Sequence, residues 1–288
     1  MWLFLAVNQF NYLISISELI RNGFDCKYIL KEIEFLQKVK SNAIVKYFKS
    51  WNDINDNHFI QMEFCSDNLK NILRVKHQFF GRKSDSIAMN AIEYYITSQL
   101  FTEIIECVQY LHEYNPPIIH RDLKPRNILF TMVNANKGRF IKICDFGLIK
   151  FHESADMSHT QDQGTDKYMA PEVKNSRHYD TKSDIYSLSI IGKELFAIDS
   201  NRDIMGENIL LDKIIPVLRQ MTRYDEYDSS VTNERPSCAQ LLDMQNQWKI
   251  NFENLNSRDV AISIMEFLEN ESCSISLSQY TKYHLKHV

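Results

Sequence analysis

Glycine is scarce in this chain, and its distribution excludes one kind of nucleotide-binding loop. The sequence has seven glycines among 288 residues, and Gly23 is the only one in the first 65 positions. A loop that wraps its backbone around phosphate groups needs several closely spaced glycines. The N-terminal part of the sequence therefore contains no glycine-rich phosphate-binding loop.

The cysteines are few and do not form a recognisable pattern. Six are scattered along the sequence, and no Cys-x-x-Cys pair occurs. This spacing argues against a zinc ribbon and against a disulfide framework. We expect reduced thiols in a cytosolic protein.

The sequence also lacks a strong charge imbalance and a long apolar run. Its 33 Lys and Arg residues and 37 Asp and Glu residues give a net charge of −4, which indicates neither a nucleic-acid partner nor a membrane surface. The apolar start at Met1 has no basic region and is ended by Asn8 and Gln9, so we do not expect a signal peptide. No stretch approaches the length of a membrane span. We therefore expect a cytoplasmic protein.

Hydrophobic periodicity predicts a β-rich beginning followed by a mainly helical remainder. Residues 2–7 and 12–16 predict a hairpin, and further strands are expected at 44–51, 58–65 and 140–144. The expected helices cover about residues 25–39, 67–74, 92–111, 183–196, 214–221, 238–248 and a segment after Ser257. Residues 77–90 predict a loop, and residues 271–288 show no clear periodicity, so we expect them to be loosely ordered.

The residues with the clearest chemical purpose lie in 118–130, where a short polar segment stands between two apolar runs. Asp122 can accept a proton from a hydroxyl, and Lys124 can place a positive charge beside a transferring phosphoryl group. Asn127 can ligate Mg²⁺ through its amide oxygen. Asp145, eighteen residues later, begins an Asp-Phe-Gly sequence and can supply a carboxylate to the same metal. Taken singly, each residue could instead be a helix cap or turn residue.

Three elements in this order, His-Arg-Asp, Asp-Phe-Gly and the Met-Ala-Pro-Glu sequence at 169–172, resemble the signature of eukaryotic protein kinases. The resemblance implies an α+β, bilobal protein-kinase-like fold. It would comprise a truncated β-rich N-lobe at 1–64, a mainly α-helical C-lobe at 65–250, and a C-terminal helix and tail at 251–288. It also implies ATP and Mg²⁺ as cofactors and a protein substrate.

The resemblance assigns roles to the polar residues. Asp122 and Lys124 would be catalytic, Asn127 and Asp145 would bind metal, and Thr165 would form part of the substrate platform. A lysine at 124 and a threonine at 165 are typical of the serine/threonine class.

Further residues match the nucleotide site and the scaffold of the family. Asp184 would brace the catalytic loop, and Glu172 would form a structural ion pair with Arg235. Met62 would be the gatekeeper beside the adenine pocket. The residues implied in ATP binding are Glu32, Met62, Glu63, Cys65 and Leu129.

One subgroup is indicated by the strand and hinge sequences at 44–65 and by residues 127–132, which resemble the kinases of translation initiation factor 2, alpha subunit. Thr160 lies five residues before Thr165, as in that subgroup. It is a candidate regulatory phosphosite whose phosphate would pair with Arg121. The resemblance implies translational control, with the alpha subunit of initiation factor 2 as substrate.

The sequence departs from the family pattern in its first residues. Ser15 occupies the position of the strand lysine that normally pairs with Glu32, and Leu13 stands where the family has a small alanine. Lys27 is close to Glu32 in sequence and is an alternative partner. The segment 196–214 is short where the family carries the helix that docks the initiation factor. These departures leave two functions open, an active serine/threonine kinase and a pseudokinase that regulates a related kinase or competes for its substrate.

Overall fold

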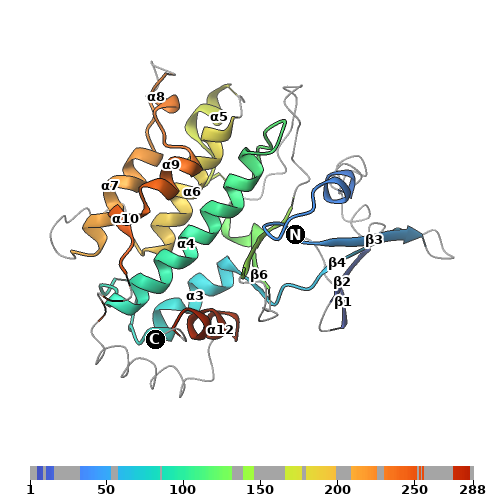
Figure 1. The fold of residues 1–288 in the computed structure, drawn as a ribbon, viewed down its shortest axis with the longest axis horizontal. Coiled ribbons are helices and arrows are strands. Elements are labelled where there is room, and N and C mark those ends of the chain that lie inside the picture. The colour runs from blue at the N-terminus through green and yellow to red at the C-terminus, as the bar shows by residue number, and fades with distance from the viewer. Residues whose placement is uncertain are drawn as a thin grey trace.

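The computed structural model describes part of the chain. The described residues are 5–8, 11–15, 33–52, 58–84, 86–131, 139–145, 166–176, 180–198, 209–225, 230–251, 253, 255 and 275–285, with the backbone alone described for 5–8 and 11–15. In Figure 1 a small sheet lies to one side and a larger helical part to the other, with a second small sheet between them.

The N-terminal sheet has four antiparallel strands in the order β1-β2-β4-β3. These strands are β1 (Leu5–Asn8), β2 (Asn11–Ser15), β3 (Tyr47–Asn52) and β4 (His58–Glu63). The predicted hairpin is present, since β1 and β2 pair with Leu5 opposite Leu13. Strand β3 forms an edge of the sheet, and β4 is paired on both sides.

The second sheet connects the segment after β4, here called the hinge (residues 63–66), to the segments that carry Asn127 and Asp145. It consists of β5 (Asp67–Asn68), β6 (Ile128–Phe130) and β7 (Ile141–Ile143) in that order. Val45 N donates to Ile143 O at 3.1 Å, and Ile143 N donates to Ala43 O at 2.9 Å. The strand predicted at 44–51 therefore begins only at Tyr47, because the residues before it pair with β7 instead.

Helix α4 is the central element of the helical part (Figure 1). It begins after Asn90, whose side-chain oxygen accepts the Glu93 N–H at 2.8 Å, as an N-cap does. The apolar residues spaced at helical intervals are all at most 2% exposed, which confirms the predicted stripe: Ile92, Ile96, Leu100, Ile104, Val108 and Leu111. Contacts to α6, α9 and β7 surround the helix.

The helices with printed bounds are α3 (Leu69–Phe79), α4 (Ala91–His112), α5 (Pro171–Ser176), α6 (Thr181–Leu195), α7 (Leu211–Met221), α8 (Ser230–Asn233), α9 (Cys238–Asp243), α10 (Gln245–Trp248) and α12 (Ile275–Leu285). Residues 33–38 are also helical, and Pro125–Asn127 form a single 3-10 turn. No helix in the described ranges is both long and apolar enough to cross a membrane.

Several predicted boundaries were wrong. Helix α3 runs on to Phe79, because its buried stripe continues through Lys76 to that residue. Helix α6 begins at Thr181, since Asp180 and not Ser183 is the N-cap. The single helix predicted at 238–248 is divided at Met244 into α9 and α10. The helix predicted after Ser257 lies outside the described residues.

The prediction of a loosely ordered C-terminal stretch was wrong for residues 275–285, which form α12. Leu277 and Tyr280 are fully buried, and the Tyr280 ring packs 5.0 Å from the Phe140 ring. The periodicity was hidden because two of the buried positions are polar, Ser276 and Thr281.

Candidate active site

The loop that carries Asp122, Lys124 and Asn127 is fixed by hydrogen bonds to Asp184 of α6. Its Oδ2 accepts the His120 N–H at 2.9 Å, and its Oδ1 accepts the Arg121 N–H at 3.0 Å. Arg121 has a φ of 70°, a left-handed conformation that a non-glycine residue adopts only under constraint. The two hydrogen bonds to Asp184 supply that constraint, and the predicted bracing contact is present.

Asp184 is a buried carboxylate with a histidine neighbour. Burial alone would raise its pKa, but the hydrogen bond and charge of His112 hold the pKa of Asp184 below its usual value. His112 Nε2 lies 2.9 Å from Asp184 Oδ2. The base of the loop is therefore fixed by an ionised group with partners on both oxygens.

The side chains of Asp122, Lys124 and Asn127 converge on one point of the loop. Lys124 Nζ is 2.7 Å from Asp122 Oδ2, and Asn127 Nδ2 is 3.2 Å from the same oxygen and 2.9 Å from Asp122 O. Burial raises the pKa of Asp122, Lys124 lowers it, and the charge of Asp145 raises it again. The net rise gives this carboxylate a stronger affinity for a proton than an ordinary aspartate has.

Asn127 and Asp145 are brought to the same place by the strand pair β6–β7. Cys144 N donates to Asn127 O at 3.0 Å, and His120 Nε2 lies 3.0 Å from Cys144 O. His120 Nδ1 accepts the Asp122 N–H at 3.3 Å, so Nε2 is the donor to Cys144 O. The backbone just before Asp145 is thereby tied to the loop that carries Asp122.

The two residues have the donor chemistry that Mg²⁺ takes. The Asn127 amide nitrogen donates to Asp122, so the amide oxygen is the atom that could bind a cation, and Asp145 offers a carboxylate. Mg²⁺ is commonly held by one or two such protein oxygens, with the phosphates of the substrate completing its shell. No cluster of three His, Cys, Asp or Glu residues able to hold a metal occurs in the described ranges.

The predicted adenine-binding residues line the connection between the sheets. Met62 and Cys65 are 5% and 4% exposed, and Leu129, half-buried on β6, lies opposite Lys142 of β7. The Glu63 N–H donates to Lys46 O at 2.8 Å. The Glu63 N–H is therefore already engaged within the protein and would not bind a ligand at the hinge.

Lys142 is a residue of this region that sequence reasoning missed. Its Nζ lies 3.0 Å from Glu63 Oε2 and donates to Asn42 O at 3.2 Å and Ile44 O at 3.3 Å. Thr131 Oγ1 donates to the other Glu63 oxygen at 3.3 Å. The hinge glutamate is thus tied to both strands that lead to the metal ligands. The available signal was a lysine between two isoleucines of a buried strand.

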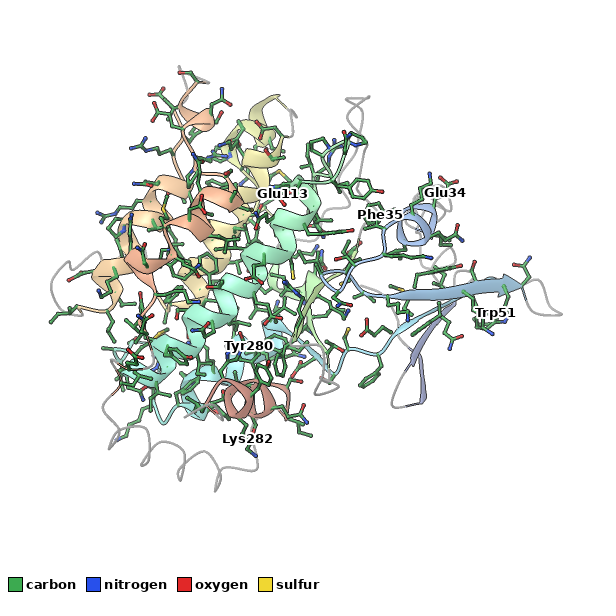
Figure 2. All side chains as sticks on the ribbon, viewed as in Figure 1. Glu34, Phe35, Trp51, Glu113, Tyr280 and Lys282 are labelled. Atoms are coloured by element: carbon green, nitrogen blue, oxygen red, sulfur yellow. The ribbon has the colours of Figure 1, made fainter. Side chains whose placement is uncertain are left out.

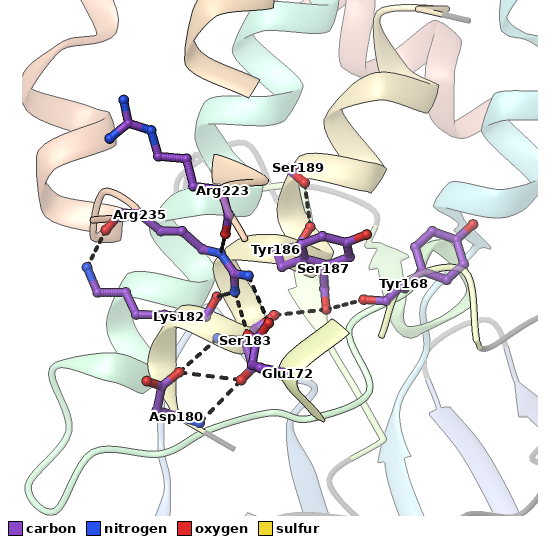
Figure 3. Close-up of polar contacts among 10 residues, drawn as sticks. All are labelled: Tyr168, Glu172, Asp180, Lys182, Ser183, Tyr186, Ser187, Ser189, Arg223 and Arg235. Carbon is purple, nitrogen blue, oxygen red and sulfur yellow. Dashed lines mark hydrogen bonds and ion pairs between the residues drawn. The ribbon is translucent and has the colours of Figure 1, made fainter. Parts of the chain in front are cut away.

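The predicted ion pair between Glu172 and Arg235 is present (Figure 3). Arg235 is 1% exposed and contacts both Glu172 oxygens, at 2.6 Å from Nη1 and 2.9 Å from Nη2. Its remaining donors reach Arg223 O and Lys182 O at 2.8 and 3.0 Å. Bidentate on Glu172 and bonded to two backbone carbonyls, the guanidinium anchors α5 to α6 and to the segment before α9.

Other predicted positions lie outside the described residues. These are Glu32, Thr160 and Thr165. For Ser15 and Leu13 the structure gives the backbone register alone, with Ser15 opposite Phe59 and Leu13 opposite Gln61. The assignments made to these five residues therefore stay predictions.

Comparison with known proteins identifies the family. A model of the protein kinase domain family matches residues 15–244. The chain therefore belongs to that family, and the predicted α+β fold, with small sheets and a mostly helical remainder, is confirmed.

The relatives include serine/threonine kinases from several organisms. Serine/threonine-protein kinase pakG of Dictyostelium discoideum is 34% identical over 58% of this chain and 13% of its own length. Serine/threonine-protein kinase cst-1 of Caenorhabditis briggsae is 32% identical over 59% of this chain and 31% of its own length. The interferon-induced, double-stranded RNA-activated protein kinase of Rattus norvegicus is 29% identical over 80% of this chain and 46% of its own length. The chain thus spans less than half the length of each relative.

Proposed function

We propose that this protein is a serine/threonine kinase that transfers the γ-phosphate of ATP to a protein hydroxyl. The observation that carries the proposal is the convergence of Lys124 and Asn127 on the Asp122 carboxylate, within 2.7 and 3.2 Å of the same oxygen. Phosphoryl transfer requires positioning and charge stabilisation more than covalent help. A base, a cation and an amide oxygen held on one braced loop meet that requirement.

Each residue has a definite task in this proposal. Asp122 orients the substrate hydroxyl and takes its proton, aided by the raised pKa of its buried carboxyl group. Lys124 neutralises charge on the γ-phosphate. Asn127 and Asp145 would hold Mg²⁺, which when bound offsets the negative charge of the phosphates. The family uses ATP and Mg²⁺ in general, and the oxygen donors present here fit that use.

The test is replacement of Asp122. Asp122→Ala should lower transfer of labelled phosphate from Mg²⁺–ATP to a protein by about 10²–10⁴-fold, the usual contribution of a positioned acid or base. The melting temperature should stay close to that of wild type, since apolar neighbours anchor the loop on both sides. Asp243→Ala, at an exposed position of α9, is the matched control. Wild-type turnover in Asp122→Ala would refute the assignment.

The second candidate function is a pseudokinase that binds a related kinase or its substrate. Ser15 at the position of the strand lysine favours it. Loss of one charge-assisted contact to the phosphates removes about 1.5–3 kcal/mol, or one to two decades of affinity. A thermal-shift titration with Mg²⁺–ATP distinguishes the two. Weak but saturable stabilisation supports the kinase, whereas no shift at millimolar nucleotide supports the pseudokinase.

We propose the alpha subunit of initiation factor 2 as substrate, and hence a role in translational control in the cytoplasm. Support comes from the resemblance of residues 44–65 and 127–132 to that subgroup of kinases. The match of the rat double-stranded RNA-activated kinase to 80% of this chain agrees with it. Labelling of the purified alpha subunit by wild type, compared with the Asp122→Ala variant, tests the proposal. Labelling of a general kinase substrate alone would reject this choice of substrate.

We also propose that phosphorylation of Thr160 activates the protein. A phosphate adds about −1.5 to −2 charges and would pair with Arg121. Thr160→Ala should lower activity, and Thr160→Glu should restore part of it. If Thr160→Ala is as active as wild type, control by this residue is excluded.

A further inference from the structure

Helix α12 lies outside the part of the chain that matches the kinase domain family, which ends at residue 244. It is nevertheless built into the catalytic part of the molecule. Leu277 and Tyr280 are fully buried, and Leu285 is 6% exposed. In Figure 2 Tyr280 lies on the side of α12 that faces α4 and the strands, and Lys282 lies on the opposite side.

The inner face of α12 covers the strand pair that leads to the metal ligands. The Tyr280 ring lies 6.2 Å from the Phe130 ring at the end of β6 and 5.0 Å from the Phe140 ring just before β7. The Tyr283 ring lies 4.9 Å from Phe140. Edge-on aromatic contacts of this kind fix the orientation of the rings as well as burying them. Helix α12 thus restrains the far ends of the two strands whose near ends carry Asn127 and Asp145.

The same short segment of backbone is restrained from α4. Glu103 Oε1 accepts the N–H groups of Phe140 at 2.5 Å and Ile141 at 2.9 Å. Phe140 is therefore held on one side by a buried carboxylate and on the other by the rings of α12. These contacts on both sides of Phe140 restrict the movement of the backbone at the start of β7.

The first turn of α12 reaches the hinge. Ser276 Oγ lies 2.8 Å from Ser66 Oγ, and the Ser66 hydroxyl donates to Phe130 O at 3.3 Å. Ser66 follows Cys65, one of the residues predicted to contact adenine. The hinge, the end of β6 and α12 therefore meet at two adjoining hydrogen bonds.

Strand pairing by itself links the hinge to β6 through only two residues. Strand β5 has two residues, which pair with Phe130 and Leu129 of β6. So short a strand contributes little stability by itself. The contacts of α12 supply the additional restraint at this junction.

We propose that α12 is a positioning element of the nucleotide site, which fixes the hinge relative to the β6–β7 pair through Ser276 and Tyr280. The backbone that contacts adenine and the residues that bind the metal would then keep the separation that a nucleoside triphosphate spans. This role rests on the proposed kinase function for its purpose, but its structural effect can be measured without any nucleotide.

The experiment uses the full chain with four single variants and one double variant. Ser276→Ala and Ser66→Ala each remove one side of the hydroxyl pair, and their double variant reports the coupling between them. Tyr280→Ala removes the ring contacts. Lys282→Ala, on the exposed side of the same helix, is the matched control. Amide hydrogen exchange without nucleotide and the Kd for Mg²⁺–ATP are measured on each.

We expect faster exchange, by about tenfold, at hinge residues 63–66 and in β6 and β7, with unchanged exchange in α9 and α10. The Kd for Mg²⁺–ATP should rise by a similar factor in Tyr280→Ala and by less in Ser276→Ala. The double serine variant should behave like either single one. Lys282→Ala should match wild type throughout.

Three results would overturn the proposal. They are unchanged exchange at the hinge, faster exchange spread evenly over the helical part, and faster local exchange with an unchanged Kd. If wild type itself fails to bind Mg²⁺–ATP, the proposed kinase function fails. In that case local exchange still decides whether α12 restrains the hinge.

Discussion

Strand β3, at the edge of the N-terminal sheet, is mostly exposed, whereas helix α4, at the centre of the helical part, is mostly buried. In β3 only Tyr47 is partly covered and the other five residues are exposed. In α4, 16 of the 22 residues are buried. Side chains on β3, such as Lys49 above the Trp51 ring at 4.9 Å, contact one another at the surface, whereas those of α4 contact the core.

The difference is clearest in the charged residues. Glu93 of α4 is fully buried between Lys76, at 2.5 Å, and Arg82, at 2.6 Å. Buried charges persist only with well-placed partners, so each one specifies a single geometry. The proposed catalytic residues lie among groups of this kind, and the exposed strand carries none of them. The positions of side chains are therefore most constrained in the buried part of the molecule, where a misplaced charge costs the most free energy.

The largest loss of stability should follow from removing the negative charge of Glu93, which lies buried between Lys76 and Arg82. Glu93→Gln leaves Lys76 and Arg82 without their anionic partner, so it should lower the free energy of unfolding by about 4–5 kcal/mol. Urea denaturation measures the loss. Glu106→Gln on the same helix is the matched control, because the Glu106 side chain is 40% exposed and its pair with Arg139 should contribute at most about 1 kcal/mol. Equal losses in the two variants would contradict the comparison.

Replacement of Asp184 should come next. Asp184→Asn should cost about 3 kcal/mol at neutral pH, since the carboxylate is buried and charged. The pKa of Asp184 is lowered in the folded state from its ordinary value of 3.8, so its contribution is complete above that pH and is lost as the pH falls through the lower folded pKa. Unfolding followed between pH 7 and pH 2 should show wild type and variant converging only in strong acid. A gap that closes near pH 6 would point to a histidine instead.

A smaller effect is expected at the hinge. Lys142→Met removes a cation that lies 3.0 Å from Glu63 and donates to two carbonyls, so we expect a loss of about 1.5–2 kcal/mol. The melting transition should shift accordingly, and the exposed Lys49→Met on β3 should shift it little. If both lysines have the same small effect, the hinge contact does not contribute to stability.

The smallest effect is predicted on the exposed strand. Trp51→Ala removes a ring that is 37% exposed and stacks 5.8 Å from Phe59, so the loss should be about 0.5–1 kcal/mol. Guanidinium denaturation can resolve this value. A loss above that of Lys142→Met would reverse the order of the two regions.

Much of the fold was predictable because its signals are local. The apolar stripe of α4, the hairpin of β1 and β2, and the apolar segments on either side of Asp122 can all be read from neighbouring residues. Boundaries were less predictable, since α3 continues to Phe79 only because Lys76 is buried against Glu93. That contact joins residues 17 apart in sequence, and periodicity does not record it.

Motifs in the sequence were sufficient to identify the family and the groups that could act, Asp122, Lys124, Asn127 and Asp145. Motif spacing is enough for this, because the residues of each motif lie within a few positions of one another in the chain. The contact of Lys142 with the hinge glutamate and the packing of α12 behind the strands of the site could be seen in the folded structure alone. Both depend on contacts between distant segments, such as Ser66 with Ser276, 210 residues apart. Burial decides such contacts, and burial is a property of the whole folded chain.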